Sequence, residues 1–253
     1  MKKQLIIILC IVIIVPIAII GFLANKTAID ILSDNLTENT NNVTIQLTDG
    51  FDKVFEGYNN SLVMLRNNKK LKNTFNTPEN EILDIFRNYE SGHDDVTAAY
   101  IGTTDGKMYF LKSENLPSDF DPRKRPWYKN AKDLKKPVWT NPYTDASSGN
   151  TIVTGSISVY NNNEFIGVIG FNINITSLAQ ELSNQKIGAD GYAVLVGKDK
   201  KIIVHPDESL IGKPSPVQKI ADAMEEKEEG GVTYNYKGKE KYIYFKKMET
   251  TGW

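Results

Sequence analysis

The stretch NTIVTGSISVYNNNEFIGVIGFNINI, residues 150–175, decides the fold class. Two runs rich in β-branched residues flank three asparagines at positions 161–163. β-Branched side chains favour strands and asparagine favours turns, so this stretch predicts two strands joined by a turn. The segment VTAAYIGTTDGKMYFLK, residues 96–112, has the same form around a Thr-Asp-Gly turn signal at 104–106. We therefore expect antiparallel hairpins in this part of the chain.

The C-terminal third repeats this style and adds helices. Residues 191–206 predict two strands joined by a Lys-Asp-Lys turn, and residues 232–248 predict a hairpin around Lys-Gly-Lys. Residues 176–187 predict a helix capped by its first threonine or serine, Thr176 or Ser177. Residues 216–231 predict a helix that two glycines end. The sequence therefore predicts an α+β fold with two mixed units of hairpins and helices.

A long helix is expected before these units, because residues 25–76 contain no proline and their apolar residues recur at steps of three and four. These apolar residues are Ile29, Leu32, Leu36, Val43, Leu47, Phe51, Val54, Phe55, Tyr58, Leu62 and Leu65. At 1.5 Å per residue such a helix reaches about 70 Å, enough to run beside two stacked domains. A coiled-coil seam with a second copy is an equal interpretation of its N-terminal half. A shorter helix is predicted over residues 79–89, opened by Thr-Pro.

The N-terminus has the composition of a membrane span. Residues 5–24, LIIILCIVIIVPIAIIGFLA, are uncharged over a length that matches about 30 Å of hydrocarbon. Lys2 and Lys3 precede this span, so residues 1–4 are expected in the cytoplasm and the remainder outside. A cleaved secretory signal is the alternative, but it would have a shorter apolar core and a small-residue cleavage site.

Composition and motifs exclude several classes of function. The 30 basic and 31 acidic residues give a net charge of −1, which argues against a nucleic-acid-binding protein. The single cysteine, Cys10, lies in the apolar stretch, so no disulfide framework or thiolate metal site is expected. The two histidines, His93 and His205, are far apart and belong to no metalloprotease or hydrolase motif. We expect no catalytic residues, no metal and no cofactor.

The loop DFDPRKRPWYKNAK, residues 119–132, carries the chemistry of a binding site. Its two prolines restrict the backbone, so the trio Arg125, Trp127 and Tyr128 loses little entropy on binding a ligand. Arginine fits a carboxylate with two parallel hydrogen bonds, while the indole and phenol add donors and apolar walls. The alternative is a surface loop with an aromatic anchor and solvated charges.

A second loop follows in NPYTDASSGNTIVTGS, residues 141–156, which places Tyr143 and Asp145 just before a strand. If both loops close over one sheet, Arg125 faces a carboxylate and Asp145 faces an ammonium group. Such a layout suits a zwitterionic small molecule. Taken alone, the Tyr-Thr-Asp triplet is more typical of a turn.

Four stretches together resemble double Cache sensory domains of bacterial transmembrane receptors. They are FDPRKRPWY, NPYTDASSG, GVIGFNINI and GADGYAVLVGKDKKIIVHPDESLIGK. The resemblance covers residues 5–253 and implies a methyl-accepting chemotaxis protein, a sensor histidine kinase or a related signalling protein. It implies that a stalk helix over 25–76 supports two PAS-like modules, a membrane-distal one over 77–175 and a membrane-proximal one over 176–253. Family members continue through a last strand into a second membrane span, so a truncated C-terminus is expected here.

The resemblance also implies a ligand site in the distal module. In the amino-acid-binding branch, Arg and Trp hold the ligand carboxylate, which assigns that role to Arg125 and Trp127. Tyr and Asp residues hold the amino group, which assigns Tyr128, Tyr143 and Asp145 to the ammonium side. We expect no catalysis, and a homodimer with its interface along residues 27–60.

Two positions depart from the pattern of that branch. Phe120 stands where a tyrosine is expected, and Asn172 stands where the GVIGxD strand has an aspartate. The Asn172 amide still offers an oxygen acceptor, but the ionic attraction for an ammonium group is lost. We therefore expect weaker amino-acid binding, or a carboxylate ligand that lacks the amine.

The leading hypothesis is the ligand-sensing domain of a transmembrane chemoreceptor for an amino acid or a related small carboxylate. One alternative is the sensor of a histidine kinase or diguanylate cyclase. A second is a protein-interaction ectodomain with an empty pocket, and a third, a membrane-anchored hydrolase, lacks the nucleophile–base pair that it requires.

Overall fold

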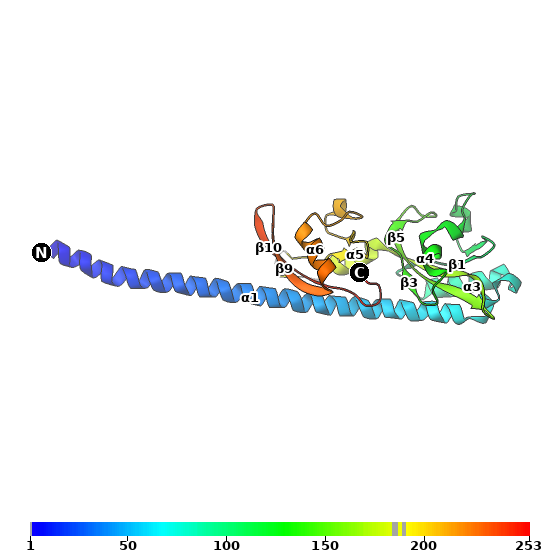
Figure 1. Cartoon of the computed structure of the whole chain (residues 1–253), viewed down its shortest axis with the longest axis horizontal. Coiled ribbons are helices and arrows are strands. Elements are labelled where there is room, and N and C mark those ends of the chain that lie inside the picture. Colours follow the sequence, from blue (N-terminus) through cyan, green and yellow to red (C-terminus); the bar gives the residue numbers. More distant parts are fainter. Residues whose placement is uncertain (1, 184–186, 189–190) are drawn as a thin grey trace.

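The computed structural model describes residues 2–183, 187–188 and 191–253. One long helix, α1, carries two modules along its C-terminal part, while its N-terminal part extends beyond both of them (Figure 1). We call the sheet module farther from the N-terminus the distal module, and the module that contains β7 to β10 the proximal module. This architecture confirms the predicted long helix with antiparallel sheet modules.

Helix α1 is a continuous segment, Lys2–Asn67, with Pro16 inside it. The predicted apolar span and the predicted stalk are therefore parts of one helix. In the described part of the chain, Ile13–Asn67 of α1 is the segment that is long and apolar enough to cross a membrane. It contains an 18-residue window of mean hydropathy 1.6, and none of that window is buried.

The long helix ends at Asn67 and not at residue 76 as the sequence predicted. Asn68 takes an extended conformation, and its side chain accepts hydrogen bonds from the backbone N–H groups of Lys70 and Leu71. This cap starts a separate short helix, because an asparagine oxygen satisfies the free N–H groups of a new first turn. The elements that follow are α2 (Lys69–Lys72), η1 (Thr74–Asn76) and α3 (Glu79–Ser91).

The distal module is an antiparallel sheet with strand order β2-β1-β6-β5-β3, and β4 also pairs with β5. The strands are β1 (Val96–Thr103), β2 (Met108–Phe110), β3 (Val138–Trp139), β4 (Tyr143–Thr144), β5 (Thr151–Asn161) and β6 (Glu164–Asn174). Both hairpins predicted for this region are confirmed, β1–β2 and β5–β6. At the second turn Asn162 and Asn163 have positive φ angles of 46° and 68°, a conformation that asparagine tolerates better than most residues.

The two faces of this sheet pack against different partners. Ala99 and Ile101 of β1 belong to the larger core, which also contains Phe55 of α1. Ala98 and Tyr100 of the same strand belong to a second cluster beneath the loop of η3 (Pro122–Lys124) and α4 (Pro126–Ala131). Successive strand side chains point to opposite faces, so one strand serves both clusters. A further short helix, η2 (Ser113–Asn115), follows β2.

The proximal module contains α5 (Ile175–Ser183), β7 (Leu195–Val196), β8 (Ile202–Val204), η4 (Glu208–Leu210), α6 (Gln218–Glu226), β9 (Glu229–Tyr236) and β10 (Lys239–Lys246). Both of its predicted hairpins are confirmed. Helix α5 is capped by Asn174, whose side chain accepts from the Thr176 N–H at 2.8 Å, and not by Thr176 or Ser177. The end predicted for this helix, near residue 187, follows residues 184–186, which lie outside the described residues.

Two glycines were predicted to end the helix that precedes β9, but α6 ends earlier, at Glu226. Lys227 is already extended, and Gly230 and Gly231 lie inside β9. A Cβ on Gly231 would lie 2.1 Å from the hydroxyl of Tyr242 on β10. Gly231 therefore makes room for the aromatic side chain of Tyr242 on the neighbouring strand.

Polar contacts attach the proximal module to α1. The Tyr242 hydroxyl donates to Asn41 Oδ1 at 2.8 Å. The carboxylate of Asp52 accepts from the backbone N–H groups of Glu249 and Thr250 at 2.9 and 3.0 Å. The segment after β10 is thereby fixed on the helix that also supports the distal module.

Candidate ligand-binding site

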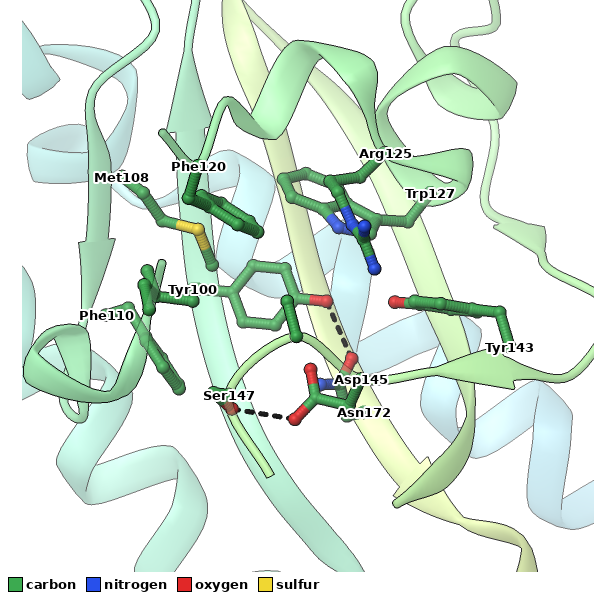
Figure 2. A pocket seen from close by; sticks show the side chains of 12 residues that line it. Tyr100, Met108, Phe110, Phe120, Arg125, Trp127, Tyr143, Asp145, Ser147 and Asn172 are labelled. Carbon is green, nitrogen blue, oxygen red and sulfur yellow. Dashed lines mark hydrogen bonds between the residues drawn. The ribbon is translucent and has the colours of Figure 1, made fainter. Parts of the chain in front are cut away.

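A pocket lies on the face of the distal sheet that carries the η3–α4 loop (Figure 2). Its lining residues are Tyr100, Met108, Phe110, Leu116, Phe120, Arg125, Trp127, Tyr143, Asp145, Ala146, Ser147 and Asn172. The space between them that no atom occupies is about 270 Å³, including the solvent at the mouth.

The η3–α4 loop is fixed by its own turn chemistry. Asp121 Oδ1 accepts from the backbone N–H of Arg123 at 2.9 Å, and the two side chains form a paired contact at 2.9 and 3.0 Å. The Arg123 guanidinium holds the pKa of the Asp121 carboxyl below its usual value. Arg123 also donates to the carbonyl of Thr104 at 3.1 Å, which fastens the loop to the β1–β2 turn. Pro122 and Pro126 occupy the first turns of η3 and α4, positions that proline favours.

The loop approaches the sheet closely because a glycine lies beneath it. A Cβ on Gly102 would lie 2.7 Å from Pro122 Cβ and 2.8 Å from the ring of Trp127. The Trp127 ring packs on that of Tyr100 with centroids 4.9 Å apart, and it is 2% exposed. Trp127 is therefore held between the loop and strand β1, with its edge on the pocket.

Arg125 is a cation without a matching anion in the described part of the chain. Its Nη2 donates to the Thr144 carbonyl at 3.2 Å, and no described carboxylate lies within 4.0 Å of its guanidinium. Its Cζ lies 5.8 Å from the ring centroid of Phe120 and 5.6 Å from that of Tyr143. The aromatic rings and the carbonyl thus orient Arg125 while leaving donors available at the pocket.

A chain of hydrogen bonds crosses the floor of the pocket. The Tyr100 hydroxyl donates to Asn172 Oδ1 at 2.6 Å, and the Thr154 hydroxyl donates to the same oxygen at 2.8 Å. The Tyr143 hydroxyl lies 2.7 Å from Thr154 Oγ1. Burial raises the pKa of the Tyr100 and Tyr143 phenols, so both stay neutral hydrogen-bonding groups at physiological pH.

Asp145 is held in place by the loop that follows it. Its Oδ2 accepts from the Ser147 and Ser148 hydroxyls at 2.7 Å each, and from the Ser148 N–H at 3.0 Å. The backbone N–H of Asp145 donates to the Asn150 carbonyl at 2.9 Å. Within the described residues, its other oxygen, Oδ1, has no partner. The carboxylate therefore keeps one acceptor for a ligand.

The model of the Cache domain family matches residues 28–253. The chain belongs to the Cache domain family. The fold is similar to the ligand-binding domain of the Pseudomonas fluorescens chemoreceptor CtaA in complex with L-leucine. Here the TM-score is 0.68 and the identity 25%, covering 84% of this chain and 88% of that one.

Two curated relatives of this Cache domain are methyl-accepting chemotaxis proteins. Over 143 residues the chain is 36% identical to PscA of Pseudomonas syringae pv. tomato, covering 54% of this chain and 23% of that protein. Over 251 residues it is 28% identical to McpC of Bacillus subtilis, covering 96% of this chain and 37% of that protein. The chain therefore spans less than two fifths of the length of these relatives.

The Cache fold brings together most of the residues predicted from the two loops and β6. Those that line the pocket are Phe120, Arg125, Trp127, Tyr143, Asp145 and Asn172. Tyr128 does not line it. Successive residues of a helix point about 100° apart, so Tyr128 of α4 does not point into the pocket that Trp127 lines. Its ring packs on Trp127 and Phe165 with centroids 5.6 and 6.1 Å apart.

Sequence reasoning missed half of the lining of this Cache pocket. The missed residues are Tyr100, Met108, Phe110, Leu116, Ala146 and Ser147. Tyr100 pairs with Phe110 on one side and with Gly170 on the other. A Cβ on Gly170 would lie 2.8 Å from the Tyr100 ring. Gly170 was thus the available signal, because a glycine paired with a tyrosine on the next strand leaves room for the Tyr100 ring to lie over β6.

Proposed function

We propose that this chain is the ligand-sensing region of a transmembrane chemoreceptor and that it binds an amino acid or a related small carboxylate in the distal module. The observation that carries the proposal is Arg125, an oriented cation that lines the pocket and has no described carboxylate within 4.0 Å of its guanidinium. A ligand carboxylate accepts from Arg125 and from the indole N–H of Trp127, while Asp145 and Tyr143 receive donors from the rest of the ligand.

The proposal follows the expected division of the chain. Residues 77–175 form the ligand-binding module, and residues 176–253 form the module that passes the change towards the membrane. Residues 5–24 of α1 cross the membrane, and residues 27–60 form the interface of a homodimer. Because α1 runs without a break from the apolar segment to the distal core, a ligand that favours one position of the module shifts the helix as well.

A chemotaxis output is favoured over a kinase or cyclase output by the relatives, which are methyl-accepting chemotaxis proteins. A second membrane span after residue 253 belongs to the same proposal. The protein-interaction alternative requires a pocket that no small molecule fills, and the unpaired Arg125 argues against it.

The test is a binding screen on the chain reconstituted in lipid nanodiscs. Amino acids, amines and small carboxylates are screened by thermal shift, and the carboxylates that stabilise the chain are measured by calorimetry. Arg125→Ala should raise their Kd about 10- to 100-fold, because a hydrogen bond to a charged group contributes about 1.5–3 kcal/mol. Lys124→Ala is the matched control, since it removes an exposed cation from the same loop. The proposal fails if both variants bind equally well, or if no carboxylate binds.

A further inference from the structure

The polar floor of the distal pocket fits a hydroxyl group better than an ammonium group. We infer that the ligand is a 2-hydroxy carboxylate with a small apolar side chain, and that Asn172 is the residue that sets this preference. The inference rests on the proposed function, because it assumes that the ligand carboxylate lies at Arg125.

The oxygen of Asn172 is already occupied. It accepts from Tyr100 at 2.6 Å and from Thr154 at 2.8 Å, and an amide oxygen has two lone pairs. Asn172 is 2% exposed, so its amide is fixed between these hydroxyls. The expectation that Asn172 accepts from the ligand through its oxygen is therefore not met by this arrangement.

The nitrogen of Asn172 is what remains for the ligand. In the described residues nothing accepts a hydrogen bond from its Nδ2, yet this atom is not among the fully buried polar atoms that lack a partner. Since Asn172 lines the pocket, Nδ2 opens onto it. At the position where an ammonium-binding site needs an acceptor, this site presents a donor.

The neighbouring groups are acceptors. Thr154 has one hydroxyl proton, which goes to Asn172, so the 2.7 Å contact with Tyr143 is donated by Tyr143. The Tyr143 oxygen therefore offers lone pairs to the pocket. Asp145 offers Oδ1, which has no partner in the described part of the chain, since the Ser147 and Ser148 contacts all go to Oδ2.

The ligand group that fits these neighbours must both donate and accept. An ammonium group has only donors, so the Asn172 N–H would face another N–H. A 2-oxo group has only acceptors, so its oxygen would face the Asp145 carboxylate. A hydroxyl donates to Asp145 or Tyr143 and accepts from Asn172, so of the three groups it alone matches both the acceptors and the donor.

The opposite part of the lining is apolar. Met108, Phe110 and Phe120 lie together at one end of the pocket, away from Tyr143 (Figure 2). Leu116 is a further apolar residue of the lining. With the carboxylate at Arg125 and the hydroxyl at Asn172, this wall receives the substituent on the second carbon. It favours an alkyl or aryl group, because nothing in it forms strong hydrogen bonds.

Three compounds with one carbon skeleton test the inference directly. L-2-Hydroxyisocaproate, L-leucine and 2-oxoisocaproate differ in the group on the second carbon, and each is titrated into the chain in nanodiscs by calorimetry. The hydroxy acid should bind at least tenfold more tightly than either of the others. Asn172→Asp should reverse the order of the first two, because a carboxylate restores an anionic acceptor for the ammonium group.

The control is Asn163→Asp, which adds the same charge at the exposed β5–β6 turn and should leave all three affinities unchanged. The inference is overturned if L-leucine binds the unaltered chain at least as tightly as the hydroxy acid, a comparison that needs no variant. It is also overturned if Asn172→Asp folds and keeps the original order. If these three compounds fail but another carboxylate binds in an Arg125-dependent way, the proposed function stands and this inference falls. If no carboxylate binds, both fall.

Discussion

Phe171 and Asn172 are consecutive residues of β6 that face opposite sides of the distal sheet. Asn172 lies at the floor of the pocket, 2.6 Å from the Tyr100 hydroxyl. Phe171 lies in the core against α1, with ring centroids 5.6 Å from Tyr58 and 5.8 Å from Trp139. One peptide unit therefore joins the pocket side of the sheet to the aromatic cluster on the long helix.

This position makes Phe171 a large contributor to stability. Phe171→Ala should lower the free energy of unfolding by about 3–5 kcal/mol, because it leaves a cavity among buried rings. Thermal and denaturant unfolding followed by circular dichroism would measure the change. Phe75→Ala, at a ring that is 49% exposed, should change stability by less than about 0.5 kcal/mol. Equal effects of the two substitutions would contradict this account of the core.

Gly102 and Gly57 should respond to alanine in opposite directions. A Cβ at Gly102 meets Pro122 and Trp127 at 2.7 and 2.8 Å, so Gly102→Ala should destabilise the chain by about 1–3 kcal/mol. Gly57 lies in α1 with nothing within 4 Å of its added Cβ. Gly57→Ala should stabilise the helix by up to about 1 kcal/mol. The shift of the thermal midpoint measures both, and a stabilising Gly102→Ala would show that the loop is not seated on β1.

Alkaline pH should destabilise the fold through its buried tyrosines. Burial raises the pKa of Tyr89 to about 12 and raises the pKa of Tyr100 in the same direction. Since the unfolded chain loses these protons near pH 10, stability is retained below that pH and falls as pH rises above it. Each such tyrosine contributes a slope of about 1.4 kcal/mol per pH unit. Tyr89→Phe should reduce this slope between pH 10 and 11 by about 1 kcal/mol per pH unit, because the unfolded tyrosine is only partly ionised there. An unchanged slope would count against the burial of Tyr89.

Asp52 should control the exchange of the segment that follows β10. Asp52→Ala removes the acceptor of the Glu249 and Thr250 N–H groups, which should speed their hydrogen exchange at least tenfold. Asp34→Ala removes an exposed carboxylate from the same helix and serves as the control. Mass spectrometry of peptides that cover residues 249–252 reports the effect. Equal exchange in the two variants would mean that other contacts hold the segment.

Local signals predicted the hairpins because their causes are local. The asparagines at 161–163 and the Thr-Asp-Gly at 104–106 specify turns between strands whatever packs on them. The pair Gly230 and Gly231 misled the prediction, because glycine both ends helices and admits a ring from a neighbouring strand. Only the pairing of β9 with β10, which places Tyr242 near Gly231, decides between the two.

The site was predicted where one loop carries its residues and missed where the sheet supplies them. Arg125 and Trp127 share a short proline-bounded segment, so their proximity follows from the sequence. Tyr100 depends on which face of β1 the η3–α4 loop covers, and the strand pattern alone does not fix that face. The orientation of the Asn172 amide depends on hydroxyls from two other strands, which bind its oxygen and leave its nitrogen towards the pocket. No local sequence pattern contains this information.

The unbroken course of α1 makes this helix a lever as well as a support. From Phe55, in the aromatic cluster, to Ile20, in the apolar segment, the helix advances about 50 Å at 1.5 Å per residue. A tilt of about 2° at the cluster therefore moves the apolar segment sideways by about 2 Å, a shift of the size that helices make in known molecular switches. In the proposed function, a small movement of the distal module at the pocket would thus become a larger sideways movement of the apolar segment.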